Sequence, residues 1–78
     1  NPSKDVVTVS YILSEGGEVN ITLFDVNGKE IKALLNKNQA SGAYSETFRF
    51  NGSVEAGVYF IKISKDGEQI AQRLLSIQ

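Results

Sequence analysis

The chain has no cysteine, no histidine and no tryptophan among its 78 residues. Without cysteine, disulfides, thiol catalysis and thiolate metal sites are excluded together. Without histidine, neither a serine–histidine pair nor an imidazole metal site can be built from these side chains. The stability of such a small domain must therefore come from packing and from backbone hydrogen bonds.

The net charge is close to zero, and the chain has no long apolar run. Eight basic and nine acidic residues are interspersed and give a net charge of -1. No basic stripe could neutralise phosphates, so we expect no nucleic-acid partner. No run approaches the roughly 20 apolar residues that a membrane span requires, and no amino-terminal signal peptide is visible. Because the chain opens with Asn1 rather than Met, we expect residues 1–78 to form a single domain of a larger protein.

Alternation of apolar and polar residues is the main pattern in the chain. It predicts strands over residues 7–13, 19–23 and 31–35, although Leu34 beside Leu35 blurs the third. Residues 44–50 form a fourth candidate strand with an aromatic face.

Two further apolar segments complete the prediction. Residues 58–63 are apolar on both faces near their start, which indicates a strand that is central or covered on both sides. Residues 70–77 predict a last strand. Helix is a weaker alternative for residues 30–35 and 69–75, because both segments are too short for an isolated helix. We therefore expect an all-β fold, an immunoglobulin-like antiparallel β-sandwich of about six to seven strands.

Turn residues separate these segments. Asn27-Gly28 and Asp66-Gly67 predict type I′ hairpin turns, since asparagine, aspartate and glycine tolerate positive φ. Residues 36–42 are polar and predict a loop, and a second loop runs from Asn51-Gly52 to Gly57.

Few residues suggest metal binding or modification. The segment Asp25-Val26-Asn27-Gly28 superficially resembles a calcium loop, but it lacks the third ligand and the distal glutamate, so we interpret it as a plain turn. Two glycosylation sequons, at Asn20 and Asn51, are short enough to arise by chance. We predict no catalytic residue, no metal site and no cofactor.

The aromatic residues allow two interpretations. They could fill the core between the sheets, or form an exposed platform for sugar stacking. In a small domain the core is favoured, and Phe60 or Tyr44 would be the first to be exposed. The set comprises Tyr44, Phe48, Phe50, Tyr59 and Phe60. Lys62 and Arg73, in the last two strands, are most simply charges that protect sheet edges from aggregation.

The ordered motifs of the chain resemble a known family. They are a Val-x-Val-x-Tyr-x-Leu strand at residues 7–13, a Val-x-Ile-x-Leu-Phe-Asp-x-x-Gly-Lys segment at residues 19–29, Gly57-Val58-Tyr59-Phe60, and the closing strand Gln72-Arg73-Leu74-Leu75. The order is similar to that of the type A carboxy-terminal sorting domain of the type IX (Por) secretion system. The resemblance extends over essentially the whole chain.

The resemblance implies a non-catalytic immunoglobulin-like domain at the end of an exported protein. It implies transit through the periplasm, passage through a type IX outer-membrane translocon, and cleavage by a surface sortase that attaches the cargo to the cell surface. The partners would be the translocon, the sortase and an amino-terminal cargo domain. By position, the residues expected to be recognised by the secretion machinery are Gly57, Val58, Tyr59, Phe60, Lys62, Arg73, Leu74 and Leu75.

Recognition could proceed by strand addition to the edge of the last strand, with Phe60 and Arg73 giving side-chain specificity. The same exposed edge also allows pairing with a second copy of the chain, which would give a homodimer. Two other functions also stay open at this point: a structural or spacer module, and a carbohydrate-binding module of a secreted hydrolase. The latter requires two or three coplanar, exposed aromatic rings.

Overall fold

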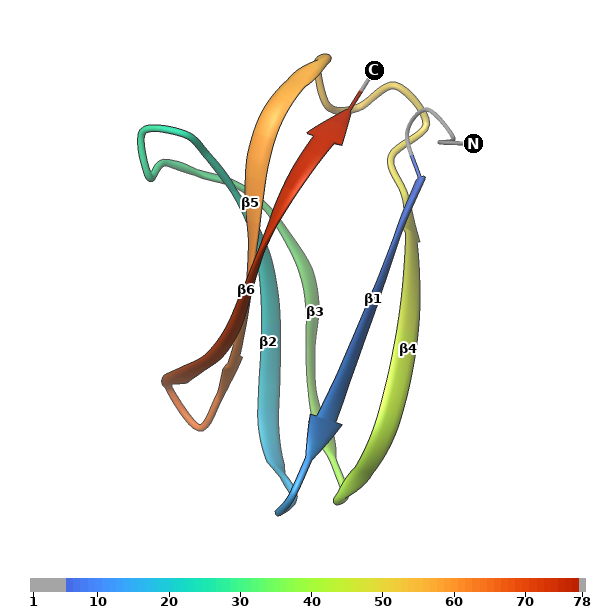
Figure 1. Ribbon diagram of the computed structural model, residues 1–78, viewed down its shortest axis with the longest axis vertical. Helices are drawn as coiled ribbons and strands as arrows, with labels where there is room; N and C mark the ends of the chain where they lie inside the picture. Colours follow the sequence, from blue (N-terminus) through green and yellow to red (C-terminus); the bar gives the residue numbers. More distant parts are fainter. Residues whose placement is uncertain (1–5, 78) are drawn as a thin grey trace.

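The computed structural model describes residues 6–77 and contains six β-strands in that range (Figure 1). They are β1 (Val6–Leu13), β2 (Gly17–Asp25), β3 (Glu30–Gln39), β4 (Gly42–Arg49), β5 (Gly57–Lys65) and β6 (Glu68–Ile77). The all-β prediction is confirmed, and both segments with a helical alternative are strands. Within the described residues, no helix is long and apolar enough to cross a membrane.

The strands form two antiparallel sheets that face each other. One sheet has four strands in the order β3-β2-β5-β6, and the other pairs β1 with β4. Figure 1 shows β1 and β4 together on one side of the molecule, with the four-stranded sheet on the other. This arrangement is consistent with the predicted immunoglobulin-like sandwich.

The core depends on the two inner strands of the larger sheet. Alternate residues of β2 and β5 point toward the smaller sheet, and their partners in register share the same face. Five of these side chains have no exposed surface: Val19, Ile21, Leu23, Ile61 and Ile63. Full burial stabilises each by about 1.5–3 kcal/mol. The prediction that residues 58–63 form a central strand is confirmed, since β5 is paired on both sides.

The four-stranded sheet is wider than the two-stranded one, so part of the inner face of β3 and of β6 is open to water. Lys32 and Lys37 of β3 are paired with the buried Leu23 and Val19, so they stand on the core side of an edge strand. Arg73 of β6 is paired with the buried Ile61 and stands on the same side. Charges that point inward at a sheet edge discourage pairing with another chain.

Strand β3 contains two bulges that the sequence pattern signals only indirectly. Ile21 pairs with Leu35 but Thr22 pairs with Ala33, so Leu34 is an extra residue. Leu34 and Leu35 both pack against the core, which a regular strand would not allow. The blurred alternation at this leucine pair is therefore the mark of a bulge. A second shift, between Leu23 and Phe24, inserts Ile31.

The predicted loop over residues 36–42 is wrong. Strand β3 continues to Gln39, and Gly42 already belongs to β4, so Ala40 and Ser41 alone connect the two. The segment is polar because it lies on an edge strand with one side in water. Asn36 and Asn38, both exposed, are paired with Asn20 and Glu18 of β2.

The two predicted type I′ turns have different outcomes. At Asp66-Gly67 both φ angles are positive, 50° and 87°, which confirms the prediction. At Asn27-Gly28 the prediction is wrong, because only Gly28 has a positive φ, of 88°. There the Gly28 amide donates to the Asp25 carbonyl at 3.0 Å, and the Asp25 amide donates to the Lys29 carbonyl at 2.9 Å. These contacts are typical of a three-residue hairpin loop with a glycine bulge.

The Asp25 carboxylate stabilises the longer loop. Its Oδ1 accepts hydrogen bonds from the backbone amides of Asn27 and Lys29, each at 2.9 Å. Local bonds from an aspartate side chain favour such turns, and a two-residue I′ turn would not place both amides around one oxygen.

A polar chain crosses the core beside the β3–β4 connection. The Tyr11 hydroxyl donates to Gln39 Oε1 at 2.7 Å, and Gln39 Nε2 donates to Glu46 Oε2 at 3.1 Å. Gln39 is buried, and Tyr11 stacks on Tyr44 with ring centroids 5.4 Å apart. Burial raises the pKa of Tyr11 above 10.0, although the hydrogen bond to Gln39 opposes this shift.

We predict that Tyr11→Phe lowers the free energy of unfolding by about 1 kcal/mol near pH 8, because Gln39 loses a hydrogen bond. The difference in free energy of unfolding between the wild type and the variant should shrink above about pH 10. In that range Tyr11 ionises in the unfolded chain but stays protonated in the folded chain. Rising pH therefore lowers the free energy of unfolding of the wild type, but has no such effect on the variant, which lacks the hydroxyl. Urea unfolding of both proteins between about pH 8 and 11 measures the difference. A constant deficit over this range would contradict the raised pKa of Tyr11.

Candidate functional site

The eight residues predicted for recognition all lie on the hairpin formed by β5 and β6. The hairpin is paired without a shift from Gly57 with Ile77 to Ile63 with Ala71, and a bulge at Ile70 lies beyond this range, so strand alternation divides the eight residues between two faces. The inner face carries Gly57, Tyr59, Arg73 and Leu75, and the outer face carries Val58, Phe60, Lys62 and Leu74. The structure therefore brings them together on one element but not on one surface.

Gly57 and Tyr59 form a corner that starts β5. The Tyr59 ring is buried, and its hydroxyl donates to the carbonyl of Glu55 at 2.6 Å. Gly57 has a φ of 156°, and a Cβ there would lie 3.6 Å from the Tyr59 ring. These two residues position the strand and present little surface to a partner.

The same corner occurs at the start of β4. Gly42 has a φ of 148°, and the Tyr44 hydroxyl donates to the carbonyl of Ala40 at 2.7 Å. In both corners a tyrosine two residues after a glycine bonds to the carbonyl four residues before itself. The repeated Gly-x-Tyr sequence was the available signal, and our sequence analysis missed it.

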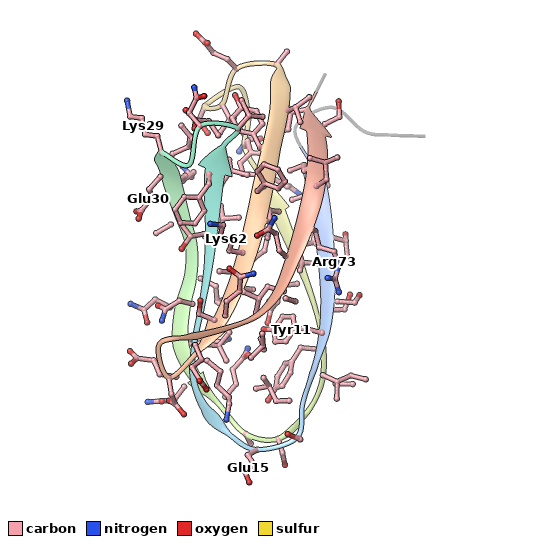
Figure 2. The ribbon with its side chains drawn as sticks, turned by 60° about the vertical axis from the view of Figure 1, so that its left-hand side comes forward. Tyr11, Glu15, Lys29, Glu30, Lys62 and Arg73 are labelled. Atoms are coloured by element: carbon pink, nitrogen blue, oxygen red, sulfur yellow. The ribbon has the colours of Figure 1, made fainter. Side chains whose placement is uncertain are left out.

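Arg73 and Leu75 lie on the inner side of the edge strand β6. Leu75 is half-buried and packs against the core. Arg73 is exposed and donates from Nη1 to the carbonyl of Gln72 at 3.2 Å. In Figure 2 its side chain projects from β6 on the right-hand side of the view. It borders a depression of about 570 Å³ whose other residues belong to β1 and β4: Ser10, Tyr11, Ile12, Ala43, Tyr44 and Ser45.

The outer face joins residues from three strands. Phe60 is paired with Leu74 of β6 on one side and with Phe24 of β2 on the other. Lys62 Nζ lies 4.6 Å from the centroid of the Phe24 ring, which is a cation–π contact. Phe24 is a residue of this surface that the sequence analysis did not single out. Its place follows from the pairing of β2 with β5, which no local pattern reveals.

A family model described as the secretion system C-terminal sorting domain matches residues 1–78. The chain belongs to the type IX C-terminal sorting domain family. Neither a search of curated proteins nor a search of solved structures found a match. For a sorting domain, family membership implies export to the cell surface or extracellular space, a cargo on its amino-terminal side and contact with the secretion machinery.

Metal-ligating groups are dispersed in the part of the sorting domain that the structure describes. Across residues 6–77, no three histidine, cysteine, aspartate or glutamate residues are grouped so as to hold a metal ion. Asp25, in the segment that resembles a calcium loop, instead binds two backbone amides of its own turn.

We predict that Gly57→Ala destabilises the sorting domain by about 1–3 kcal/mol, because alanine is strained at this φ. The neighbouring Val58→Thr is the control. Val58 is 48% exposed, so its replacement should change the free energy of unfolding by less than about 0.5 kcal/mol. Urea unfolding measures both. If Gly57→Ala kept full stability, the corner would not constrain the strand.

Proposed function

We propose that this chain is a non-catalytic carboxy-terminal signal that directs a cargo protein through the outer membrane by the type IX system. The observation that carries the proposal is the family match over residues 1–78. Transit through the periplasm, removal by a sortase and attachment of the cargo to the cell surface belong to the same proposal.

Within this proposal, the secretion machinery reads the folded β5–β6 hairpin. Strand β6 is at the edge of its sheet, so one side of its backbone is free to pair with an added strand. After Arg73 the strand continues with Leu74, Leu75, Ser76 and Ile77, a segment with no charge and no proline. The opposite edge, β3, has two bulges and two inward lysines, whereas residues 71–77 of β6 pair with β5 without a shift and carry one inward charge, Arg73.

The carbohydrate-binding alternative receives no support from the aromatic residues. All seven rings are buried or half-buried, and none reaches the exposure that a stacking platform requires. Tyr44, Phe48, Phe50 and Tyr59 are buried in the core or packed against it, while Phe60 is half-buried on the outer face.

The test of the proposed function is export of a fluorescent protein with residues 1–78 at its carboxy terminus and an ordinary signal peptide at its amino terminus. In a host with type IX secretion, we expect fluorescence at the surface or in the medium. A secretion-deficient host should retain it in the periplasm. Retention of a folded fusion in the competent host would overturn the proposal.

A triple alanine variant at Arg73, Leu74 and Leu75 tests recognition through β6. Export should fall while the fluorescent cargo stays folded, because the variant removes the side chains beside the free edge. The single variant Leu75→Ala is the stability control, because Leu75 packs against the core. It measures how much export is lost when the domain is destabilised while Arg73 and Leu74 are kept. Normal surface display of the triple variant would exclude this mode of recognition.

Self-association through an edge strand is also part of the proposal, and β1 is the edge best suited to it. Residues 6–13 contain no charge, no glycine and no proline, and the pairing with β4 has no register shift. Such an edge is open to a second copy. In sedimentation velocity we expect a dimer to appear as concentration rises, and Ser10→Lys to remain monomeric. A wild type that stays monomeric over the same range would contradict this prediction.

A further inference from the structure

The outer face of the four-stranded sheet carries a continuous apolar row. Phe24, Phe60 and Leu74 are register partners across β2, β5 and β6, so their side chains share one face. We call these three residues the outer row. Leu74 is 69% exposed, and Val58, which precedes Phe60 by two residues on the same face, is 48% exposed. This face is therefore the side of the hairpin that a partner can reach.

Lys62 lies at the centre of this face rather than at its margin. Strand β5 is paired on both sides, so protection of a sheet edge does not explain a charge at this position. The ammonium group rests over the Phe24 ring at 4.6 Å, and no carboxylate within the described residues pairs with it. The ring orients the cation, and Glu30, the register partner of Phe24 on the same face, does not form an ion pair with it.

A shallow depression of about 280 Å³ adjoins the outer row. Phe24 and Phe60 contribute to its lining, together with Lys62, Gln72 and the turn at residues 25–28. The Asp25 carboxylate in this turn already accepts two backbone amides through Oδ1. Lys62 is thus the cation that faces this depression.

We propose that the outer row and Lys62 form the docking surface for a protein of the secretion machinery, and that this partner presents an apolar patch with one carboxylate. The proposal rests on the sorting function proposed above. A purely apolar partner would bury the Lys62 ammonium without a counter-ion, which is strongly unfavourable. A carboxylate placed over Phe24 would replace the lost hydration and give the contact its specificity.

A protein surface fits these residues better than a membrane surface. The chain has a net charge of -1, so no general attraction draws it to an anionic bilayer. The protruding apolar side chains of the hairpin's outer face are Leu74 and Val58, whereas Phe24 and Phe60 are half-buried. Interfacial binding to lipid needs a larger apolar face with several cations.

The test compares four variants of the fluorescent fusion and is done after export of the wild-type fusion has been established. Leu74→Ser removes the most exposed member of the outer row, and Lys62→Glu reverses the central charge. Ile12→Ser is the matched control for Leu74→Ser, because Ile12 is 77% exposed on the other sheet. Lys62→Arg is the matched control for Lys62→Glu, because arginine keeps the charge and the contact with the ring.

We expect Leu74→Ser and Lys62→Glu each to lower the amount of exported fusion by at least about tenfold. Ile12→Ser and Lys62→Arg should stay within about twofold of the wild type. The four variants change three side chains, of which Leu74 and Ile12 are exposed and Lys62 is half-buried, so melting temperatures should agree within about 4 °C. Full export of either Leu74→Ser or Lys62→Glu would overturn the docking surface while the sorting function stands. Failure of the wild-type fusion would instead remove the sorting function.

A second measurement distinguishes protein from lipid. The wild-type fusion is floated with vesicles of phosphatidylcholine and phosphatidylglycerol in equal parts, and we expect it to remain unbound. Vesicle binding that Leu74→Ser abolishes would overturn the assignment of a protein partner in favour of a membrane surface.

Discussion

The structure depends on the pairing of β2 with β5 at the centre of the larger sheet. Both strands are hydrogen-bonded on two sides, and five of their inward side chains are completely buried. In a chain without cysteine, this double pairing takes the place of a covalent link. Because strand alternation has a period of two, fixing the inward residues of β5 also fixes which residues face outward. The faces of residues 57–63 and of their partners, residues 71–77, follow from this single constraint.

That constraint separates two roles within the short segment at residues 57–62. Gly57 and Tyr59 act through the fold, since they shape the start of β5 and are covered by it. Phe60 and Lys62 follow directly in sequence but belong to the outer face, beside Phe24. Arg73 stands on the inner side of the edge strand β6, beside Ile61, and not on the face that carries Phe60 and Lys62. A partner that reads the hairpin therefore meets a different set of residues than the linear motif suggests.

Much of this architecture could be predicted from the sequence, because alternation and turn residues are local signals. Five of the predicted strands agree closely with the structure, and the central place of β5 followed from apolar residues on both faces. The wrong predictions concern polar residues whose hydrogen-bond or strand-pairing partners are not evident from the sequence. Residues 36–39 were assigned to a loop because an edge strand can be polar, and Asn27-Gly28 was given the wrong turn because the Asp25 side chain binds the loop amides. Phe24 was missed since its neighbours come from distant parts of the chain.

The two glycine–tyrosine corners have a consequence for how such a chain acquires its shape. Almost every other stabilising contact in a sandwich joins residues far apart in sequence, and such contacts form slowly because a long loop must close first. Each corner instead links a tyrosine hydroxyl to a carbonyl four residues earlier. Closing so short a segment loses little chain entropy. The corners at Tyr44 and Tyr59 can thus set the direction and parity of β4 and β5 before either strand has found its distant partners.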